Sequence, residues 1–330
     1  MKIKHGDAPS AGKCTAAVLS YARKSPFERA MEKYAKMFLL EEMPKYAYDW
    51  WFRCGFEYPV VLGFACFAAF AYGACLGSFM NVCIWRMPRR ESVVSAPSHC
   101  TNCGEAIRWY DNLPVLSYLI LRGRCRACRA PYSPRYFLVE VLTGALFVAI
   151  LVKAGLSQQI PGVIFFYCTT VLYAVGAAWT DAEHRIIPNA LTYPAMILAL
   201  AGTLFFPEVW GTEQRGRALL YCVLSGAIPG AFLWLFSVAG HLICKKEVLG
   251  MGDVKFVAAC GMLLGLPGAL FSLFAGALAG TLYGAFSCLI RRRKLSSCAV
   301  AFGPFLALGA VVWIFAGNFL LRLAGMLCHG

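Results

Sequence analysis

Two acidic residues stand beside long apolar runs, where a carboxylate needs a chemical or a structural reason. Asp253 lies in Gly250-Met251-Gly252-Asp253-Val254-Lys255, directly before an apolar run that begins at Phe256. Asp181 directly follows another apolar run. An aspartate in such a position caps the helix beside it in many proteins. Ionisable residues at the edge of a membrane helix are also frequently functional, so each acid taken alone leaves both alternatives open.

The two acids taken together favour catalysis. If Asp181 and Asp253 lie on one side of a membrane and share a water, they lose their protons in separate steps. The ionised carboxylate then accepts a proton from water while the protonated one donates to a substrate carbonyl, which is aspartyl proteolysis. Glu183 and His184 compete for an acid–base role, but neither has a comparable partner. We expect Gly252 to leave room for an extended substrate backbone beside Asp253.

Four cysteines form a second candidate site. Cys100-Thr-Asn-Cys103 and Cys125-Arg-Ala-Cys128 are two C-x-x-C pairs at the spacing of a zinc ribbon. Each pair supplies two thiolates from one turn, and together they complete a tetrahedral set with no open position, which is typical of structural zinc. A redox pair or unused thiols are the alternatives. Many of the other cysteines are scattered singly through apolar segments, where a free thiol behaves as a small hydrophobe.

Composition indicates the elements that must position these residues. The chain has 330 residues, 59% of them hydrophobic and 15% charged, which excludes an ordinary soluble globular protein. The apolar runs lack the alternation of an outer-membrane barrel, so we expect an all-α polytopic membrane protein. About eight transmembrane helices are expected, with the sixth short or broken near Pro267, at 59–85, 134–153, 161–180, 189–206, 218–241, 254–267, 268–290 and 299–323.

Basic residues predict the orientation. The net charge of +14 is concentrated in a few segments between spans, a pattern that reports membrane topology rather than a nucleic-acid partner. The arginine-rich segment between the first two spans is then cytoplasmic. Counting onward places 181–187, 244–255 and 291–294 on the same side. The same count places the basic N-terminal tail outside, although basic residues close to a span favour the cytoplasmic side.

The chain divides into four parts. Residues 1–58 are a polar N-terminal extension with an amphipathic helix and no visible signal peptide. Residues 59–85 are the first span, and residues 86–133 are the cytoplasmic zinc-binding loop. Residues 134–330 form the transmembrane core that carries both aspartates.

Several motifs follow one another in a specific order between Gly77 and Gly309. They are Gly77-Ser-Phe-Met-Asn-Val82, Trp85-Arg-Met-Pro88, the two C-x-x-C pairs with Asn112-Leu-Pro-Val-Leu-Ser-Tyr118 and Leu121-Arg-Gly-Arg-Cys125 between them, Val139-Glu-Val-Leu-Thr-Gly144, Asp181 with Ile187-Pro-Asn189, Gly250-Met-Gly-Asp253, and Phe302-Gly-Pro-Phe305. In this order the chain resembles the bacterial type IV prepilin peptidases, aspartyl proteases of the GxGD class.

The resemblance implies a reaction and a substrate. Such enzymes cut the basic leader from type IV prepilins, or from type II secretion pseudopilins, at the cytoplasmic face of the bacterial inner membrane. Many then methylate the new N-terminus with S-adenosylmethionine, an activity that the resemblance places in the cytoplasmic loop. By position, Asp181 and Asp253 are the catalytic pair, and the metal ligands are Cys100, Cys103, Cys125 and Cys128. The chain departs from the family at Glu183 and Asn189, where aspartate is frequent.

Two alternatives come from other classes of protein. A transporter or channel could line a cation path with the two acids, but these lie at helix ends rather than deep within spans. A zinc-dependent membrane protease would need a motif such as H-E-x-x-H, which the sequence lacks. The sequence leaves open which residues bind S-adenosylmethionine, which pilin is cut, and the oligomeric state.

Overall fold

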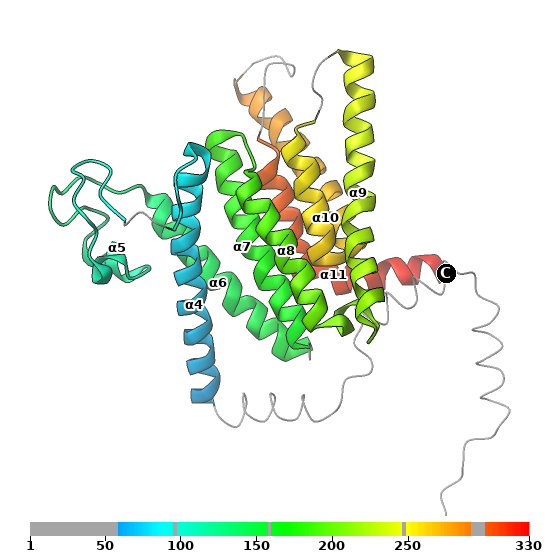
Figure 1. Cartoon of the computed structure of the whole chain (residues 1–330), viewed down its shortest axis with the longest axis horizontal. Helices are drawn as coiled ribbons and strands as arrows, with labels where there is room; N and C mark the ends of the chain where they lie inside the picture. The colour runs from blue at the N-terminus through cyan, green and yellow to red at the C-terminus, as the bar shows by residue number, and fades with distance from the viewer. Residues whose placement is uncertain (1–58, 95–97, 158–159, 246–248, 292–300, 330) are drawn as a thin grey trace, which may run out of the picture.

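The computed structural model describes residues 59–94, 98–157, 160–245, 249–291 and 301–329 (Figure 1). The long helices of this part are α4 (Pro59–Arg86), α6 (Pro134–Ser157), α7 (Pro161–His184), α8 (Asn189–Phe205), α9 (Arg215–Cys244), α10 (Met251–Arg291) and α11 (Gly303–His329). The short ones are η1 (Met87–Arg89), η2 (Trp109–Asn112), α5 (Leu116–Ile120) and η3 (Pro207–Trp210). The predicted all-α class is confirmed. The amphipathic helix predicted within residues 1–58 lies outside the described residues.

Local sequence explains where several helices begin and end. Pro59, Pro134 and Pro161 are the first residues of α4, α6 and α7, a position that proline favours because its missing N–H would have no partner there. Arg185 and Lys245 follow α7 and α9 in the left-handed conformation, and each backbone N–H closes the last turn. Within a bilayer such helices satisfy their own backbone hydrogen bonds.

The number of spans differs from the prediction. Six described helices, namely α4, α6, α7, α9, α10 and α11, are long and apolar enough to cross a membrane. The helix α8 is apolar but has only 17 residues, and the predicted spans 254–267 and 268–290 both belong to α10. The prediction of eight spans is therefore not confirmed. The protein is a multi-pass membrane protein.

The helix α10 reverses its direction at Gly265. This residue has a non-helical backbone (φ 75°, ψ 169°) two positions before Pro267, close to the predicted break. A Cβ added at Gly280 would lie against the first turn of α11, whereas one at Gly268 would lie 2.8 Å from Trp313, deeper along α11. The second part of α10 therefore runs antiparallel to α11. Both ends of α10 lie at the same end of the bundle (Figure 1).

Glycines allow close approach of neighbouring helices. A Cβ at Gly73 of α4 would lie 2.9 Å from the Phe147 side chain of α6, and one at Gly77 would lie 3.0 Å from the Glu140 Cα. Small residues at such contacts are typical of membrane helices, whose association depends on close packing. The helices α4 and α6 are thereby held together near the end that carries the loop.

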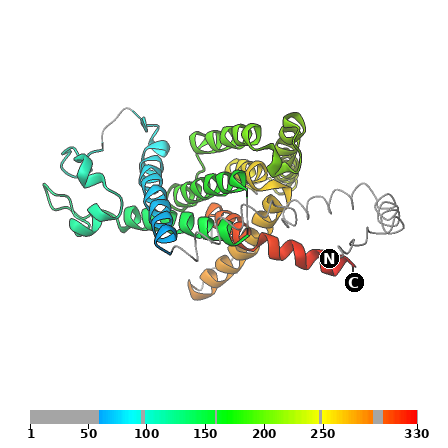
Figure 2. The same cartoon turned by 90° about the horizontal axis from the view of Figure 1, so that it is seen from below.

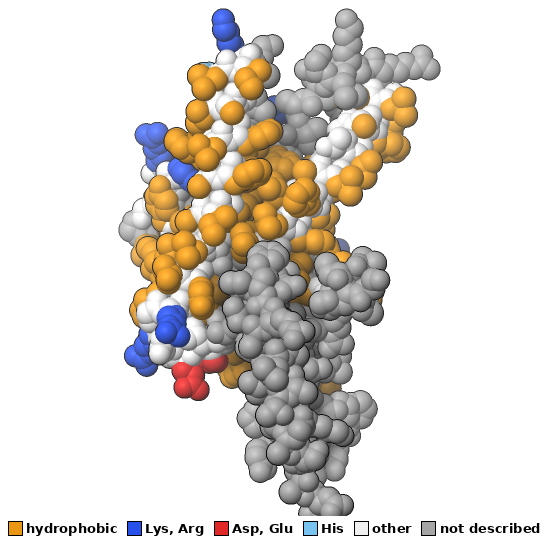
Figure 3. Space-filling view, turned by 90° about the vertical axis from the view of Figure 1, so that its right-hand side faces the viewer, with side chains coloured by type: hydrophobic (Ala, Val, Ile, Leu, Met, Phe, Trp, Pro, Cys, Tyr) orange, Lys and Arg blue, Asp and Glu red, His pale blue; other side chains and the backbone are white. Residues whose placement is uncertain are grey.

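The core lies around α7 and the first part of α10. The Tyr173 ring of α7 stacks on the Phe256 ring of α10 at a centroid distance of 5.0 Å, and both side chains are fully buried. Residues outside this core are apolar too. Figure 3 shows one face of the bundle covered by hydrophobic side chains. Large apolar side chains such as Phe232 and Phe236 of α9 are exposed. Such a surface suits contact with lipid.

The segment between α4 and α6 forms a small separate lobe. Figure 2 shows it at one edge of the bundle, beyond α4 and α6. Its described residues form two isolated antiparallel bridges, His99 to Ala106 and Arg124 to Pro131, and no regular strand. This is the zinc-ribbon-like loop expected from the sequence, and we call residues 87–133 the cysteine loop.

Candidate functional site

Asp181 lies in the last turn of α7, where its side chain is buried (7% exposed). The backbone N–H of Arg185 donates to the Asp181 carbonyl at 2.8 Å and closes the helix. The backbone N–H of Gly303, the first residue of α11, donates to Asp181 Oδ2 at 2.7 Å. A Cβ at Gly303 would lie 2.8 Å from the same oxygen. The carboxylate is therefore held by a segment far away in the sequence.

Asp253 lies in the first turn of α10 and is half-buried. Its backbone N–H donates to the Gly250 carbonyl at 3.1 Å. A Cβ at Gly250 would lie 3.4 Å from Asp253 Oδ2, so this glycine faces the carboxylate. Asp253 lies within electrostatic range of Asp181. The structure thus brings the two predicted acids together at one end of the bundle.

The connection between α7 and α8 packs on the start of α10. Lys255 Nζ donates to Asn189 Oδ1 at 2.9 Å. A Cβ at Gly252 would lie 3.3 Å from the Ile187 Cβ. The space that we expected Gly252 to leave for a substrate is therefore filled by Ile187, and the glycine lets the connection approach instead. This contact fixes α10 relative to the helix that carries Asp181.

Glu183, the predicted competitor for an acid–base role, is engaged elsewhere. Its Oε2 lies 2.5 Å from Arg135 Nη1, at the start of α6, and 3.9 Å from His184 Nε2. The carboxylate of Glu183 is therefore engaged by a buried guanidinium (6% exposed). Asp181 and Asp253 stay the candidate pair for acid–base chemistry.

The four cysteines of the loop converge on one point. Their Sγ atoms all lie within 4.8 Å of one another, and Cys100 Sγ lies 3.9 Å from Cys128 Sγ. Tetrahedral zinc with Zn–S bonds of about 2.3 Å would separate its sulfur ligands by about 3.8 Å. The two turns are built alike, since the carbonyls of Cys100 and Cys125 accept from Gly104 and Arg129. The set fits a zinc ion.

The thiols also differ in acidity. Backbone N–H groups of Cys128 and Ala127 lower the pKa of Cys125 to about 6. A hydrogen bond from the Glu105 N–H lowers the pKa of Cys103. Desolvation and the three neighbouring thiols raise it by more, so that the pKa is about 11. Four thiols this close cannot all ionise without a nearby cation.

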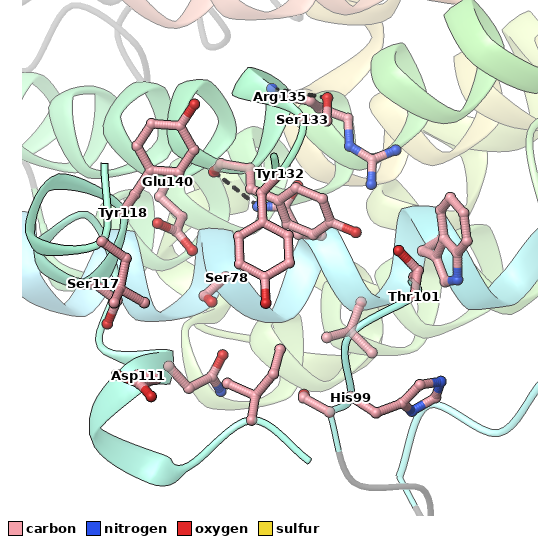
Figure 4. A pocket seen from close by; sticks show the side chains of 18 of the residues that line it. Ser78, His99, Thr101, Asp111, Ser117, Tyr118, Tyr132, Ser133, Arg135 and Glu140 are labelled. Carbon is pink, nitrogen blue, oxygen red and sulfur yellow. Dashed lines mark hydrogen bonds between the residues drawn. The ribbon is translucent and has the colours of Figure 1, made fainter. Parts of the chain in front are cut away.

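A cavity of about 360 Å³ separates the cysteine loop from the helices (Figure 4). Its helical wall comes from the last turns of α4 and the first turns of α6, and its other wall comes from the loop. Polar members of the lining include Ser78, Asn81, Arg135, Glu140 and Glu183. The cavity is therefore next to the end of α7 that carries Asp181.

Two protein-family models match this chain. A model of the bacterial peptidase A24 N-terminal domain matches residues 71–154, and that of the type IV leader peptidase family matches residues 165–285. A prepilin leader peptidase/N-methyltransferase of Xanthomonas campestris is 32% identical over 292 residues, covering 80% of this chain and 96% of the relative. The chain belongs to the type IV leader peptidase family.

Other relatives agree with this membership. A prepilin leader peptidase/N-methyltransferase of Myxococcus xanthus is 38% identical over 219 residues, covering 64% of this chain and 61% of the relative, so the match spans less than two thirds of that protein. A type 4 prepilin-like proteins leader peptide-processing enzyme of Escherichia coli is 33% identical, covering 74% of this chain and 91% of the relative. No solved structure matches the chain. The resemblance seen in the sequence is confirmed, and the transporter alternative is not supported.

Some residues near the two candidate sites were not assigned from the sequence. Gly303 and Asn81 lie in motifs that carried the resemblance, but their chemistry gave no role. The pairing of Arg135 with Glu183 was also missed, because the two residues are 48 positions apart. Glu140 accepts from the Val115 N–H at 2.8 Å, a contact that the sequence did not indicate either. All of these contacts join segments distant in sequence.

Proposed function

We propose that this protein is an aspartyl endopeptidase that removes the leader from type IV prepilins or from type II secretion pseudopilins and then N-methylates the new N-terminus. The observation that carries the peptidase assignment is the position of Asp181 and Asp253, on two different helices, at one end of a membrane bundle where the α7–α8 connection packs on the start of α10. Family membership supports the same reaction.

The two aspartates would divide the acid–base work between them. The Gly303 N–H donates to Asp181 Oδ2 and fixes the orientation of that carboxylate. The ionised member of the pair takes a proton from water, and the protonated member donates to the scissile carbonyl oxygen. The tetrahedral intermediate then collapses as the leaving amine takes up a proton.

Charge supports a cytoplasmic active site in the bacterial inner membrane. The end of the bundle that holds the aspartates also carries exposed basic residues, namely Arg89, Arg90, Arg185 and Lys245. Basic residues near span ends favour the cytoplasmic side. A prepilin has a basic leader followed by an apolar helix, so its cleavage site would lie at this same membrane surface.

We infer that the cysteine loop binds structural zinc and that S-adenosylmethionine is the methyl donor. Cys100, Cys103, Cys125 and Cys128 would hold the ion, and their mutual distances fit a closed tetrahedral site. Such a site lacks an open position for substrate. The ion would fix the loop, while the peptidase chemistry would stay with the carboxylates.

Replacing each aspartate by asparagine tests the peptidase assignment. Asp181→Asn and Asp253→Asn keep the shape of the side chain but remove its ability to exchange a proton. Each variant should lose leader cleavage of a purified prepilin by about 100-fold or more, while its amount in the membrane and its zinc content stay unchanged. Glu208→Gln, in η3 at the other end of the bundle, serves as the matched control. Near-normal processing by either aspartate variant would refute the pair.

A further inference from the structure

The cavity beside the cysteine loop has the size of a small-molecule site. Its volume of about 360 Å³ lies within the range of about 300 to 1,000 Å³ common for ligand pockets. Neither predicted site accounts for it, since the cysteines and the two aspartates are absent from its lining. Its polar groups therefore indicate what it could bind.

The helical wall offers two acceptors. Asn81 is 1% exposed, its Nδ2 donates to the Tyr136 carbonyl at 3.0 Å, and its Oδ1 has no hydrogen-bond partner. Glu140, on the facing helix, is 8% exposed and accepts from the Val115 N–H at 2.8 Å. A buried acceptor without a partner is costly. A ligand that donates hydrogen bonds at this wall would remove that cost.

The same cavity contains a buried cation. Arg135 is paired with Glu183 through Nη1, but its Nε has no partner. Guanidinium groups favour carboxylates as acceptors. The cavity thus combines acceptors for an ammonium with a donor for a carboxylate, which is the complement of the amino-acid end of a ligand.

Aromatic rings form much of the remaining wall. Trp85, Tyr118, Tyr132 and Tyr136 all line the cavity, and Figure 4 shows the rings of Tyr118 and Tyr132 beside it. Tyr118 is held in place, because its ring packs on Phe137 at a centroid distance of 5.2 Å. Ring faces attract organic cations, so this wall suits a ligand with a positively charged sulfur.

We propose that this cavity binds S-adenosylmethionine by its amino-acid end, with Asn81 and Glu140 accepting from the ammonium and Arg135 binding the carboxylate. The proposal rests on the proposed N-methylation. The bound donor supplies a methyl group on a sulfonium: the lone pair of the deprotonated pilin amine forms the C–N bond, the C–S bond breaks to a thioether, and the methylated amine releases a proton to water.

The position of the cavity suits a second step on the product of the first. Glu183 lines the cavity, and Asp181 lies less than one turn before it on α7. The Arg135–Glu183 ion pair joins the start of α6 to the end of α7. A new N-terminus released beside Asp181 would therefore have a short path to a methyl donor in this cavity.

Binding of S-adenosylhomocysteine to the purified full-length protein tests the proposal without methyl transfer. Glu140→Gln keeps an oxygen that can accept from Val115 but removes the charge, and Asn81→Leu removes the free acceptor at similar volume. Titration calorimetry should show binding weakened by about tenfold or more in each variant, since hydrogen bonds to charged groups contribute this much. Leader cleavage should stay within about twofold of normal. Glu208→Gln should bind as the unmodified protein does.

The outcomes separate this proposal from the proposed function. If the unmodified protein methylates prepilin and both variants bind S-adenosylhomocysteine normally, the cavity is not the donor site. If the unmodified protein neither cleaves nor methylates prepilin, the proposed function fails instead. Should Asn81→Leu lose cleavage as well, its fold is disturbed, and Glu140→Gln with Arg135→Lys then decides the question by binding alone.

Discussion

Gly303 contacts the carboxylate of Asp181 in a way that only glycine permits. Its N–H donates to Oδ2 at 2.7 Å, and an added Cβ would lie 2.8 Å from that oxygen. Gly303→Ala should therefore push the Asp181 side chain out of position and reduce leader cleavage by about tenfold or more, because misplaced catalytic groups lose much of their effect. Assays of turnover on a prepilin peptide would measure this.

A second glycine provides the control. A Cβ at Gly216 of α9 would meet nothing within 4 Å, so Gly216→Ala should leave cleavage unchanged. If Gly303→Ala cleaves as well as Gly216→Ala does, the Gly303 contact has no part in positioning Asp181.

Residue chemistry indicated the candidate residues that are recognisable alone. Asp181 and Asp253 became candidates because a carboxylate beside an apolar run is unusual, and the four cysteines because their spacing is specific. Asn81, Arg135 and Gly303 were not, because a free acceptor, an ion pair or a close backbone contact exists only once distant helices have packed. We expected substrate in the space beside Gly252, because the sequence does not show that Ile187 packs there.

The cysteine loop is an element with little core of its own. Among its described residues, Cys100, Gly123 and Cys125 are buried, whereas large apolar side chains such as Trp109 and Ile120 are exposed (79% and 72%). A lobe with so small a core needs another source of stability, and bound metal commonly supplies it. The loop should therefore be ordered only with its ion in place.

Metal removal tests this dependence. Chelation, or Cys103→Ser, should release the zinc, make the loop more sensitive to protease, and weaken S-adenosylhomocysteine binding by about tenfold or more. Leader cleavage should be partly retained, because the two aspartates belong to the helical bundle. Cys75→Ser, at an exposed thiol of α4, should change none of these. Complete loss of cleavage that returns on adding zinc would favour a metalloprotease.

The path of the chain through α10 agrees with the sequence. The proline at position 267 indicated a break, and the structure has one at Gly265. Counting 254–267 and 268–290 as two successive spans placed 244–255 and 291–294 on the same side, and both ends of α10 do lie at one end of the bundle (Figure 1). The number of spans was less predictable, because hydropathy does not give the length of a helix to the residue, and α8 is apolar but only 17 residues long.

At the scale of the whole molecule, charge and chemistry are polarised along the bundle. Both aspartates, the cavity and the cysteine loop share one end, together with exposed Arg185 and Lys245. The opposite end carries η3 and the start of α9, with exposed Arg215 and Arg217. Counting spans placed the basic tail, residues 1–58, outside the cell, against the charge bias. Those residues lie outside the described part of the chain.

Protease accessibility in oriented membranes tests this polarity. The arginines of the cysteine loop at 122, 124, 126 and 129 are exposed, so trypsin should cut there in inverted inner-membrane vesicles treated with a chelator. In spheroplasts the same loop should survive, whereas Arg215 and Arg217 should be the sites that external trypsin can reach. Mass spectrometry of the released peptides distinguishes the two patterns. Cleavage of the loop in intact spheroplasts would place the aspartates outside, where a prepilin leader retained in the cytoplasm could not reach them.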